Sequence, residues 1–451
     1  MRIFPPPFEV SLDEGFSPEK DLFGRAPIAE GLTRLVGSVD QPLVVALDGD
    51  WGSGKTTFLR FWTGELGKAG FPVVFFDAFQ NDYADDAFIA LAGEVFALVE
   101  QKNKGRAQAA QNFASKAVGA GKVLLRSGLK IGVKAATMGA LNASDFDELA
   151  DAVSDESADA FDANIGEMIT KQSVHRDAIE EFKSALSNLP ALLAPPAEDE
   201  DQKPLIFIID ELDRCRPAFA LALLERVKHF FSVPGVHFVL GMNSDQLANS
   251  VKAVYGSGID ARTYLQKFIH LTWTLSQRER YASDRARGKY VRHLSQAMGF
   301  KGKDAETASQ ALAFVGAIAE RRSLSFRTIE RVMAVIALAV ATTPESQLRV
   351  SPLVGGLALM KVLEPAYFTK AKEGRLTWHE AHDFLALDEL QKDTEYSWGW
   401  ASSWWQFVTD PDCPEEVIEQ MRRGLFSYSM GERFDILSYT ADVVMDNVTL
   451  R

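Results

Sequence analysis

Cysteine is scarce in this chain, which carries two in 451 residues, Cys215 and Cys413. A secreted protein of this size usually has more, because disulfides persist in oxidising compartments, so the composition favours a reducing cytoplasm. No uncharged apolar run reaches the roughly 18 residues that a membrane-spanning helix needs. The opening residues lack the basic-then-apolar pattern of a secretory leader. We therefore expect a cytoplasmic protein with no membrane span.

Net positive charge and metal-ligand spacing are also lacking. The formal net charge is -14, which argues against a generally basic nucleic-acid binder but says nothing about local basic patches. Hydrophobic residues make up 47% and charged residues 24% of the chain, a balance typical of soluble globular proteins. The following histidines show no metal-site spacing, and we interpret them as structural: His175, His229, His237, His270, His293 and His379.

Five short apolar runs predict buried parallel strands. They are LVVALD, VVFFD, LIFIID, VHFVLG and IHLTWT, at residues 43–48, 73–77, 205–210, 236–241 and 269–274. Helical patterns between the runs, one of them over residues 55–68, indicate βαβ units. The predicted fold class is α/β, with a three-layer parallel sheet built from residues 1–79 and 204–280.

Helical patterns without strands fill the remainder of the chain. Residues 80–203 are predicted to form a charged helical insert, 281–350 a helical lid and 351–451 a helical, Trp-rich C-terminal region. In that last region aromatic residues crowd into a short stretch: Trp398, Trp400, Trp404, Trp405 and Phe407. We interpret them first as core and second as anchors for a protein partner.

The octapeptide GDWGSGKT at residues 49–56 fits the pattern G-x-x-x-x-G-K-[ST] between a predicted strand and a predicted helix. Its glycines let the backbone turn N–H groups inward, which makes an anion site at a helix N-terminus. We expect Lys55 to bridge the β- and γ-phosphates of a nucleotide and the Thr56 hydroxyl to ligate Mg²⁺. The predicted nucleotide-binding residues are Gly49, Asp50, Trp51, Gly52, Ser53, Gly54, Lys55, Thr56 and Thr57.

An acidic partner follows in the segment LIFIIDELDR at residues 205–214. Asp210 ends a predicted buried strand and is expected to hold Mg²⁺ through water, as a carboxylate at that sheet edge can. Glu211 is the candidate general base for an attacking water, with Asp213 as the next candidate. Capping of the next helix, or pairing with an arginine, is the rival role for Glu211.

Three further polar residues are candidates for contacts with the γ-phosphate. Asn243 follows the strand at residues 236–241, where it would either sense the phosphate or cap the next helix. Arg327 and Arg331 lie four residues apart and share a helix face. One of these arginines, with Arg327 preferred, would reach the nucleotide, and ordinary solvated arginines are the alternative.

The predicted insert is divided by charge. Residues 102–134 contain eight basic residues and no acidic one, and residues 145–162 contain eight acidic residues and no basic one. Four cations would form a stripe on one helix: Lys122, Arg126, Lys130 and Lys134. The stripe would bind either a polyanion or the acidic segment 145–162, and the matching charges favour the acidic segment.

With these motifs the chain resembles the KAP family of P-loop NTPases. Besides the octapeptide and IIDELDRCRP at residues 208–217, the resemblance includes DLFGRAPIAEGLTRLV, HFVLGMNSDQLANSV, YLQKFIHLTWTLS and SFRTIERVM, at residues 21–36, 237–251, 264–276 and 325–333. It covers about residues 21–345 without the insert. The resemblance implies a sheet of the additional-strand type, binding of ATP or GTP with Mg²⁺, and hydrolysis.

Two departures from the family pattern bear on function. The family commonly has Asp-Asp where this chain has Asp210 and Glu211. Many relatives carry membrane helices where this chain has the basic stripe, and four cations at bilayer depth would be very costly. Because bacterial relatives often lie in mobile elements and defence clusters, the resemblance also implies phage defence as a setting.

We therefore expect a Mg²⁺-dependent ATP or GTP hydrolase that acts as a molecular switch or motor. The alternative is a nucleotide-dependent binding scaffold with little or no turnover, and a small-molecule kinase is less supported. The expected partners are the nucleotide, a second copy of the chain in a homo-oligomer, and a protein bound through the insert or the Trp-rich tail. Nucleic acid stays an open alternative, and no base preference follows from the motifs.

Overall fold

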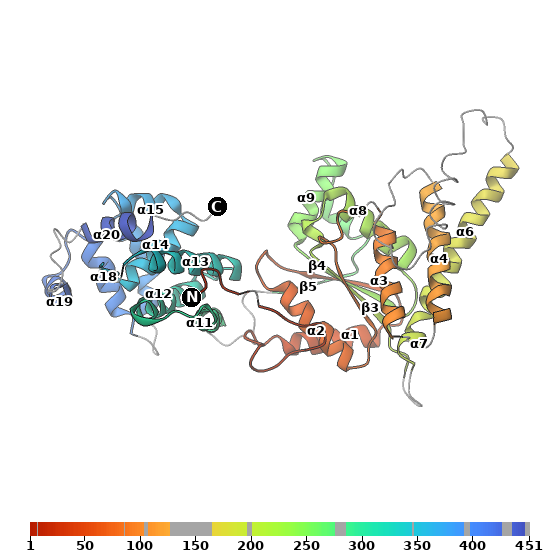
Figure 1. Ribbon diagram of the computed structural model, residues 1–451. Coiled ribbons are helices and arrows are strands. Elements are labelled where there is room, and N and C mark those ends of the chain that lie inside the picture. The colour runs from red at the N-terminus through yellow and green to blue at the C-terminus, as the bar shows by residue number, and fades with distance from the viewer. Residues whose placement is uncertain are drawn as a thin grey trace.

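The computed structural model describes the chain except residues 7, 85, 103–106, 127–164, 196–200, 276–285, 345–346, 392–396, 426–434 and 447–451. Figure 1 shows two lobes, one built around a sheet and one built from helices. The N-terminus begins at the helical lobe, where the Arg2 amide donates to the Met298 carbonyl at 2.7 Å, and the chain then runs to the sheet. The N-terminal segment therefore contacts both lobes.

The sheet has five parallel strands in the order β2-β3-β4-β1-β5. Their bounds are β1 Leu43–Asp48, β2 Val73–Asp77, β3 Leu205–Asp210, β4 Val236–Met242 and β5 Leu271–Thr274. β4 lies between the strand before the glycine-rich loop and the strand that ends in Asp210, so the sheet has the predicted additional strand. All carboxyl ends meet at one edge, because the strands are parallel.

Helices cover both faces of the sheet (Figure 1). On one face, α1 Ala26–Ser38 and α2 Lys55–Lys68 pack on inward residues of β1 and β3 such as Val45 and Ile208. On the other face, α3 Ala87–Lys102 and α8 Pro217–Arg226 pack on residues such as Val44 and Phe207. Successive strand residues point to opposite faces, so a run that is apolar throughout forms the middle layer.

Two histidines close the amino end of β1. The Nδ1 atoms of His237 and His270 accept the amides of Leu43 and Val44, at 3.2 and 2.9 Å. Burial lowers the pKa of His237, which favours the neutral ring that an acceptor nitrogen requires. Both residues have the structural role that the sequence predicts.

The described part of the insert is helical. α4 Ala107–Arg126 and α6 Ile165–Ser187 pack side by side next to α3, and α7 Leu189–Leu193 leads back to β3. Lys116 of α4 pairs with Glu181 of α6. The side chains of the basic stripe and the whole acidic segment 145–162 lie outside the described residues, so their pairing stays a prediction. No helix in the described part of the chain is long and apolar enough to cross a membrane.

Before β4, the π-helical turn Val227–Phe231 extends α8. After β4 come the last two α-helices described in the sheet lobe, α9 Ser244–Tyr255 and α10 Ala261–Leu265. The helical lobe consists of α11 Ala286–Met298, α12 Gly302–Arg321, α13 Phe326–Thr342, α14 Ser351–Leu363, α15 Pro365–Lys372, α16 Trp378–Leu385, α17 Leu387–Gln391, α18 Gly399–Thr409, α19 Glu415–Leu425 and α20 Asp435–Tyr439, with a final π-helical turn Thr440–Met445.

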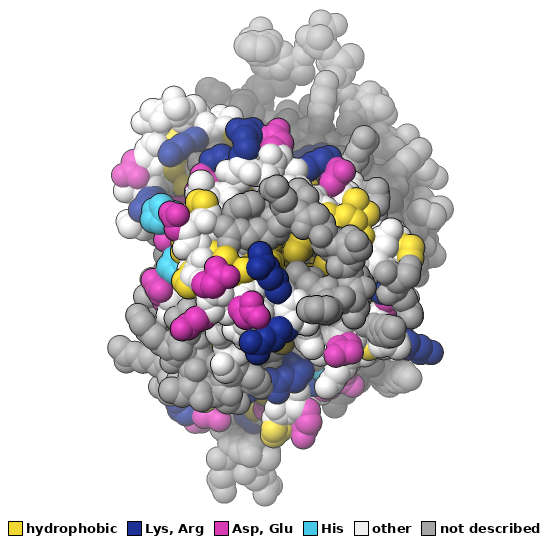
Figure 2. Space-filling view, turned by 90° about the vertical axis from the view of Figure 1, so that its left-hand side faces the viewer, with side chains coloured by type: hydrophobic (Ala, Val, Ile, Leu, Met, Phe, Trp, Pro, Cys, Tyr) yellow, Lys and Arg dark blue, Asp and Glu magenta, His cyan; other side chains and the backbone are white. Residues whose placement is uncertain are grey.

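One hydrophobic core runs through the helical lobe. It joins residues of α11 to α13 with residues of α14 to α20, across the boundary at residue 350 that the sequence suggested. Trp398, Trp405 and Phe407 belong to this core, and Trp400 and Trp404 pack against it partly buried. On the lobe surface that Figure 2 shows, acidic and basic side chains alternate with small groups of hydrophobic ones. The tryptophans thus stabilise the lobe itself.

Gly356 of α14 has no room for a side chain. A Cβ built there would lie 2.2 Å from Cζ2 of the fully buried Trp405, whose indole N–H donates to the Pro352 carbonyl. We predict that Gly356→Ala lowers the free energy of unfolding by about 1–3 kcal/mol, the usual cost of overpacking. Gly288→Ala in α11 of the same lobe is the control, because nothing lies within 4 Å of its built Cβ. Thermal unfolding of both variants tests this, and equal melting temperatures would contradict it.

Candidate nucleotide-binding site

The loop between β1 and α2 turns through two glycines in left-handed conformations. The φ angles of Gly52 and Gly54 are 77° and 84°, and Gly54 is the N-cap of α2. Residues with a Cβ rarely adopt these values, so the loop needs glycine there. The hydroxyl of Ser53 is buried without a hydrogen-bond partner among the described residues. An anion bound in the loop would supply the partner that a buried hydroxyl requires.

Lys55 occupies the first position of α2, and its ammonium is held by the loop itself. Its Nζ donates to the carbonyls of Gly49 and Asp50, at 2.6 and 3.1 Å. Burial lowers the pKa of Lys55, and the nearby carboxylates of Asp213 and Asp210 oppose this effect. A buried ammonium that only carbonyls hold is suited to exchange these contacts for phosphate oxygens.

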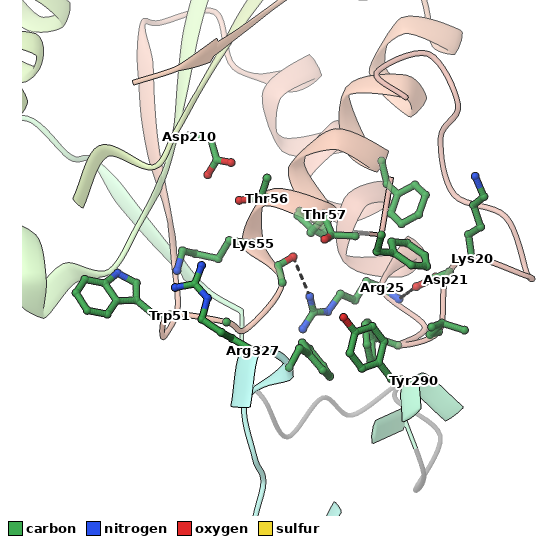
Figure 3. Close-up of a pocket in the computed structure, with 18 of the residues that line it drawn as sticks. Lys20, Asp21, Arg25, Trp51, Lys55, Thr56, Thr57, Asp210, Tyr290 and Arg327 are labelled. Atoms are coloured by element: carbon green, nitrogen blue, oxygen red, sulfur yellow. Dashed lines mark hydrogen bonds between the residues drawn. The ribbon is translucent and has the colours of Figure 1, made fainter. Parts of the chain in front are cut away.

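Thr56 and Asp210 lie together, as predicted for a metal site. The Thr56 hydroxyl lies beside the carboxylate of Asp210, whose Oδ1 accepts the Glu211 amide at 2.9 Å. Figure 3 shows the Thr56 hydroxyl facing Asp210 at one end of a cavity. Burial raises the pKa of Asp210 to about 6, and the neighbouring Thr56 hydroxyl and the Glu211 amide oppose this shift. A buried carboxylate beside a hydroxyl is a donor set that suits a hard cation.

Gly241 of β4 makes this arrangement possible. A Cβ built at Gly241 would lie 2.6 Å from Oδ1 of Asp210 and 2.6 Å from Cδ1 of Leu59. Both neighbours are buried, Asp210 at the end of β3 and Leu59 on α2, so a side chain at position 241 would displace at least one of them. Sequence reasoning missed Gly241, because only the three-dimensional structure shows which side chains lie over it.

Glu211 follows Asp210 in a left-handed backbone conformation, with φ 59° and ψ 28°. This conformation costs of order 1 kcal/mol in residues other than glycine and recurs at functional sites. The Glu211 carboxylate lines the cavity and pairs with Arg214. Burial raises the pKa of Glu211, which makes the carboxylate a better proton acceptor. The structure therefore shows the predicted arginine pair, and the role as general base stays a prediction.

Trp51 connects the glycine-rich loop to the segment after β3. Its indole N–H donates to the Asp213 carboxylate at 2.5 Å, although the tryptophan side chain is 46% exposed. Asp213 is buried and lines the same cavity as Lys55. The tryptophan inside the loop thus has a positioning role that the sequence pattern did not reveal.

Arg25 was also missed by sequence reasoning, although it lies within the motif DLFGRAP. Its side chain is 4% exposed and donates to the carbonyls of Ser53 at 2.9 Å and Gly54 at 3.3 Å. Asp21 in turn accepts the amides of Arg25 and Ala26 and so caps α1. Arg25 therefore holds the outer side of the glycine-rich loop.

The helical lobe reaches the same loop. The Phe326 amide at the start of α13 donates to the Gly52 carbonyl at 3.1 Å. Arg327 is exposed and lines the cavity, and Figure 3 shows its guanidinium on the Lys55 side. Arg331, one turn further along, is exposed and is not among the lining residues of the described cavity. The preference for Arg327 fits this geometry, and its contact with a phosphate stays a prediction.

Asn243 caps α9 in this structure. Its Oδ1 accepts the Gln246 amide at 3.0 Å, and the neighbouring Asp48 accepts the Ser244 amide at 2.7 Å. The capping role that the sequence suggested is therefore present. A second role as sensor of the γ-phosphate stays a prediction.

One cavity of about 330 Å³ lies between the sheet lobe and the helical lobe, and its lining includes Arg25, Trp51, Lys55, Thr56, Asp210, Glu211, Asp213 and Arg327. Asn243 is not among the residues that line it. Figure 3 shows Lys55, Thr56 and Asp210 at one end and Lys20, Asp21 and Tyr290 at the other. The glycine-rich loop at the start of α2 and the additional strand beside the Asp210 strand define a P-loop NTPase domain.

The chain belongs to the KAP family, because the model of the KAP family P-loop domain matches residues 25–342. A comparison with curated proteins gives no match. Membership agrees with the motifs, since the matched range includes the glycine-rich loop, the Asp210 strand and Arg327.

We predict that burial of the Asp210 carboxylate lowers the free energy of unfolding at neutral pH. Its raised pKa means that the folded state holds its proton more tightly than the unfolded state, so stability falls as pH rises from about 4 to about 6 and stays reduced above. In EDTA at pH 7.5, Asp210→Asn should therefore stabilise the protein by about 1–3 kcal/mol. The gain should vanish near pH 4. Thermal unfolding at both pH values tests this against the exposed control Asp245→Asn, and a loss of stability at pH 7.5 would contradict it.

Proposed function

We propose that this chain is a Mg²⁺-dependent nucleoside-triphosphatase that cleaves the γ-phosphate of ATP or GTP. The observation that carries the proposal is the meeting of Lys55, Thr56 and Asp210 at the N-terminus of α2, with Glu211 directly beside them. Each of these groups has the chemistry that phosphoryl transfer requires, namely a mobile cation, a metal-ligating hydroxyl, a carboxylate and a base.

The residues fit a Mg²⁺ ion that arrives with the nucleotide. Mg²⁺ in such sites is held by one or two protein oxygens, by waters and by substrate phosphates. Thr56 and Asp210 supply the protein oxygens, and the described residues hold no group of three acidic, histidine or cysteine side chains that could replace the phosphates. When bound, the ion would neutralise charge that develops on the phosphate oxygens.

The protein residues would perform the other steps. The α2 N-terminus and Lys55 hold the phosphates, with Lys55 leaving the carbonyls of Gly49 and Asp50. Glu211 would accept a proton from a water molecule while the oxygen of that water attacks the γ-phosphorus. The bond between the γ-phosphorus and the β–γ bridging oxygen then breaks. The products are the nucleoside diphosphate and inorganic phosphate. Arg327 would stabilise the charge of the transferred group from the helical lobe.

The output is proposed to be a movement of the helical lobe, as in a switch or motor. Arg327 comes from α13 and lines the cavity, so a bound nucleotide would contact both lobes. We also propose that the chain forms a homo-oligomer and that a protein partner binds it through the insert or the Trp-rich tail. A setting in phage defence rests on analogy with bacterial members of the family.

A binding scaffold with little turnover is the second candidate. The observation that favours it is the ion pair between Glu211 and Arg214, because a base that stays paired with an arginine accepts a proton less readily. Release of inorganic phosphate at saturating ATP separates the two functions. Turnover supports the hydrolase, whereas tight binding without turnover supports the scaffold.

Removal of the Lys55 ammonium tests the site assignment. We predict that Lys55→Ala abolishes phosphate release and weakens ATP binding while the protein stays folded. Lys68→Ala is the matched control, since Lys68 ends the same helix and, among the described residues, its one ion pair is an exposed one with Glu65. Isothermal titration and phosphate release measure both variants, and normal turnover by a folded Lys55→Ala protein would contradict the assignment.

Glu211→Gln tests the role of the base. The change keeps the shape but removes the proton acceptor, so ATP should still bind while phosphate release falls by about 10²–10⁴-fold. Glu30→Gln on the exposed side of α1 is the control. If Glu211→Gln releases phosphate at the wild-type rate, Asp213 becomes the candidate base.

A further inference from the structure

Arg214 lines the phosphate cavity, but none of the proposed steps uses it. Its guanidinium pairs with the carboxylate of Glu211, the candidate base. We propose that Arg214 is a switch residue that holds Glu211 when no triphosphate is bound and moves to the γ-phosphate when a triphosphate binds. The base is then released only when the bond that it helps to cleave is present. The inference rests on the proposed function and adds a residue that couples ligand binding to the base.

A fixed turn holds the two side chains next to each other. Glu211 precedes a 3₁₀ turn that ends at Arg214, and the Arg214 amide donates to the Glu211 carbonyl at 3.1 Å. Within the turn, Leu212 is fully buried in the core of the sheet lobe, and Asp213 accepts the indole N–H of Trp51. Because the backbone of the turn is anchored in this way, Arg214 can change its partner by rotating its own side chain.

The Arg214 side chain lies on a wall that two cavities share. One is the phosphate cavity, and the other is a neighbouring cavity of about 610 Å³. Both cavities are lined by Trp51, Asp213, Arg214 and Arg327. The Arg214 side chain is 30% exposed, whereas that of Glu211 is 17% exposed. Arg214 therefore has room to leave the carboxylate without displacing residues of the core.

The charges around this ion pair favour a change of partner. Arg214 lies close enough to the Lys55 ammonium for the two cations to repel each other. Glu211 in turn is repelled by two carboxylates, those of Asp77 at the end of β2 and of Asp213. A γ-phosphate beside Lys55 would bring more negative charge than one carboxylate, and a guanidinium binds phosphate oxygens through two parallel hydrogen bonds. Arg214 would thereby gain a stronger partner.

Release of Glu211 is the consequence for the reaction. A carboxylate that is paired with a guanidinium accepts a proton less readily than a free one. Once Arg214 has moved to the γ-phosphate, Glu211 is free to accept the proton of the attacking water. After cleavage the γ-phosphate leaves as inorganic phosphate, and Arg214 returns to Glu211. The ion pair is then a resting arrangement that a triphosphate opens.

Arg327 lines both cavities as well, but it is not coupled to the base in this way. It is exposed, and among the described residues the structure gives no ion pair for it. Binding of phosphate by Arg327 would therefore leave the pair of Glu211 and Arg214 intact. The two arginines predict different couplings to Glu211, so Arg327 is the matched control.

The test measures how strongly each variant prefers a triphosphate to a diphosphate. The probes are the Mg²⁺ complexes of ADP with a non-hydrolysable ATP analogue and of GDP with the matching GTP analogue, titrated into the full chain by calorimetry. The pair that binds more tightly is used for the variants. In Glu211→Gln, Arg214 has no ion pair to break, so the preference should rise by at least about twofold. In Arg214→Gln the γ-phosphate lacks the guanidinium, so the preference should fall roughly 3- to 30-fold.

A double variant separates the exchange of partners from simple repulsion. Glu211→Gln also removes a negative charge near the γ-phosphate, which by itself raises the preference whatever residue stands at position 214. An ion pair is lost on binding only where Arg214 is present. Glu211→Gln should therefore raise the preference roughly 2- to 10-fold more with Arg214 than in the Arg214→Gln background. In the Arg327→Gln background it should keep its full effect.

The outcomes separate the switch from the phosphate site. If Glu211→Gln keeps the wild-type preference, or if its effect is no larger with Arg214 than without it, the switch is wrong while the proposed function stands. Unchanged diphosphate affinity shows that a variant is folded, and Arg214→Met, which keeps the apolar stem, replaces Arg214→Gln if that affinity is lost. If the wild-type protein binds neither diphosphates nor triphosphate analogues, the proposed function fails together with the switch.

Discussion

The site depends on how closely the Asp210 carboxylate can approach the start of α2. β4 lies between β3 and β1, so the carboxylate must reach Thr56 over the additional strand. Gly241 permits this because it has no side chain between Asp210 and Leu59. The additional strand therefore does more than widen the sheet. It sets the separation of the metal-binding carboxylate and the phosphate-binding loop, and a single hydrogen atom at Gly241 keeps that separation short.

Much of the fold follows from local patterns in the sequence. β1, β2 and β3 have the predicted bounds because each is a continuous apolar run that ends at a polar residue. β5 begins two residues later than predicted, since the His270 side chain accepts the Val44 amide that a longer ladder would use. The loop, Thr56 and Asp210 were found through spacing. Arg25 and the contact of Trp51 with Asp213 were not, because these interactions join residues far apart in sequence.

Burial and function oppose each other within the site. Asp210 and Lys55 are both buried, and burial disfavours the charged form of each, raising one pKa and lowering the other. A bound ligand of opposite charge would therefore stabilise the charged form of each residue. Glu211 adds a strained backbone to this arrangement. The rest of the sheet lobe, with its apolar strands packed on both faces, provides the stability against which these costs are set.

The bond between the Phe326 amide and the Gly52 carbonyl has a consequence for how this protein can diverge in sequence. Both groups belong to the backbone, so the link between helical lobe and phosphate loop does not depend on any side chain. At position 326 only proline would remove the donor, and a first helical position tolerates proline well. Related chains could therefore exchange the side chain at position 326 and keep the connection. At the other end of the bond Gly52 must keep its left-handed φ of 77°, so this end of the contact would be recognisable as a glycine.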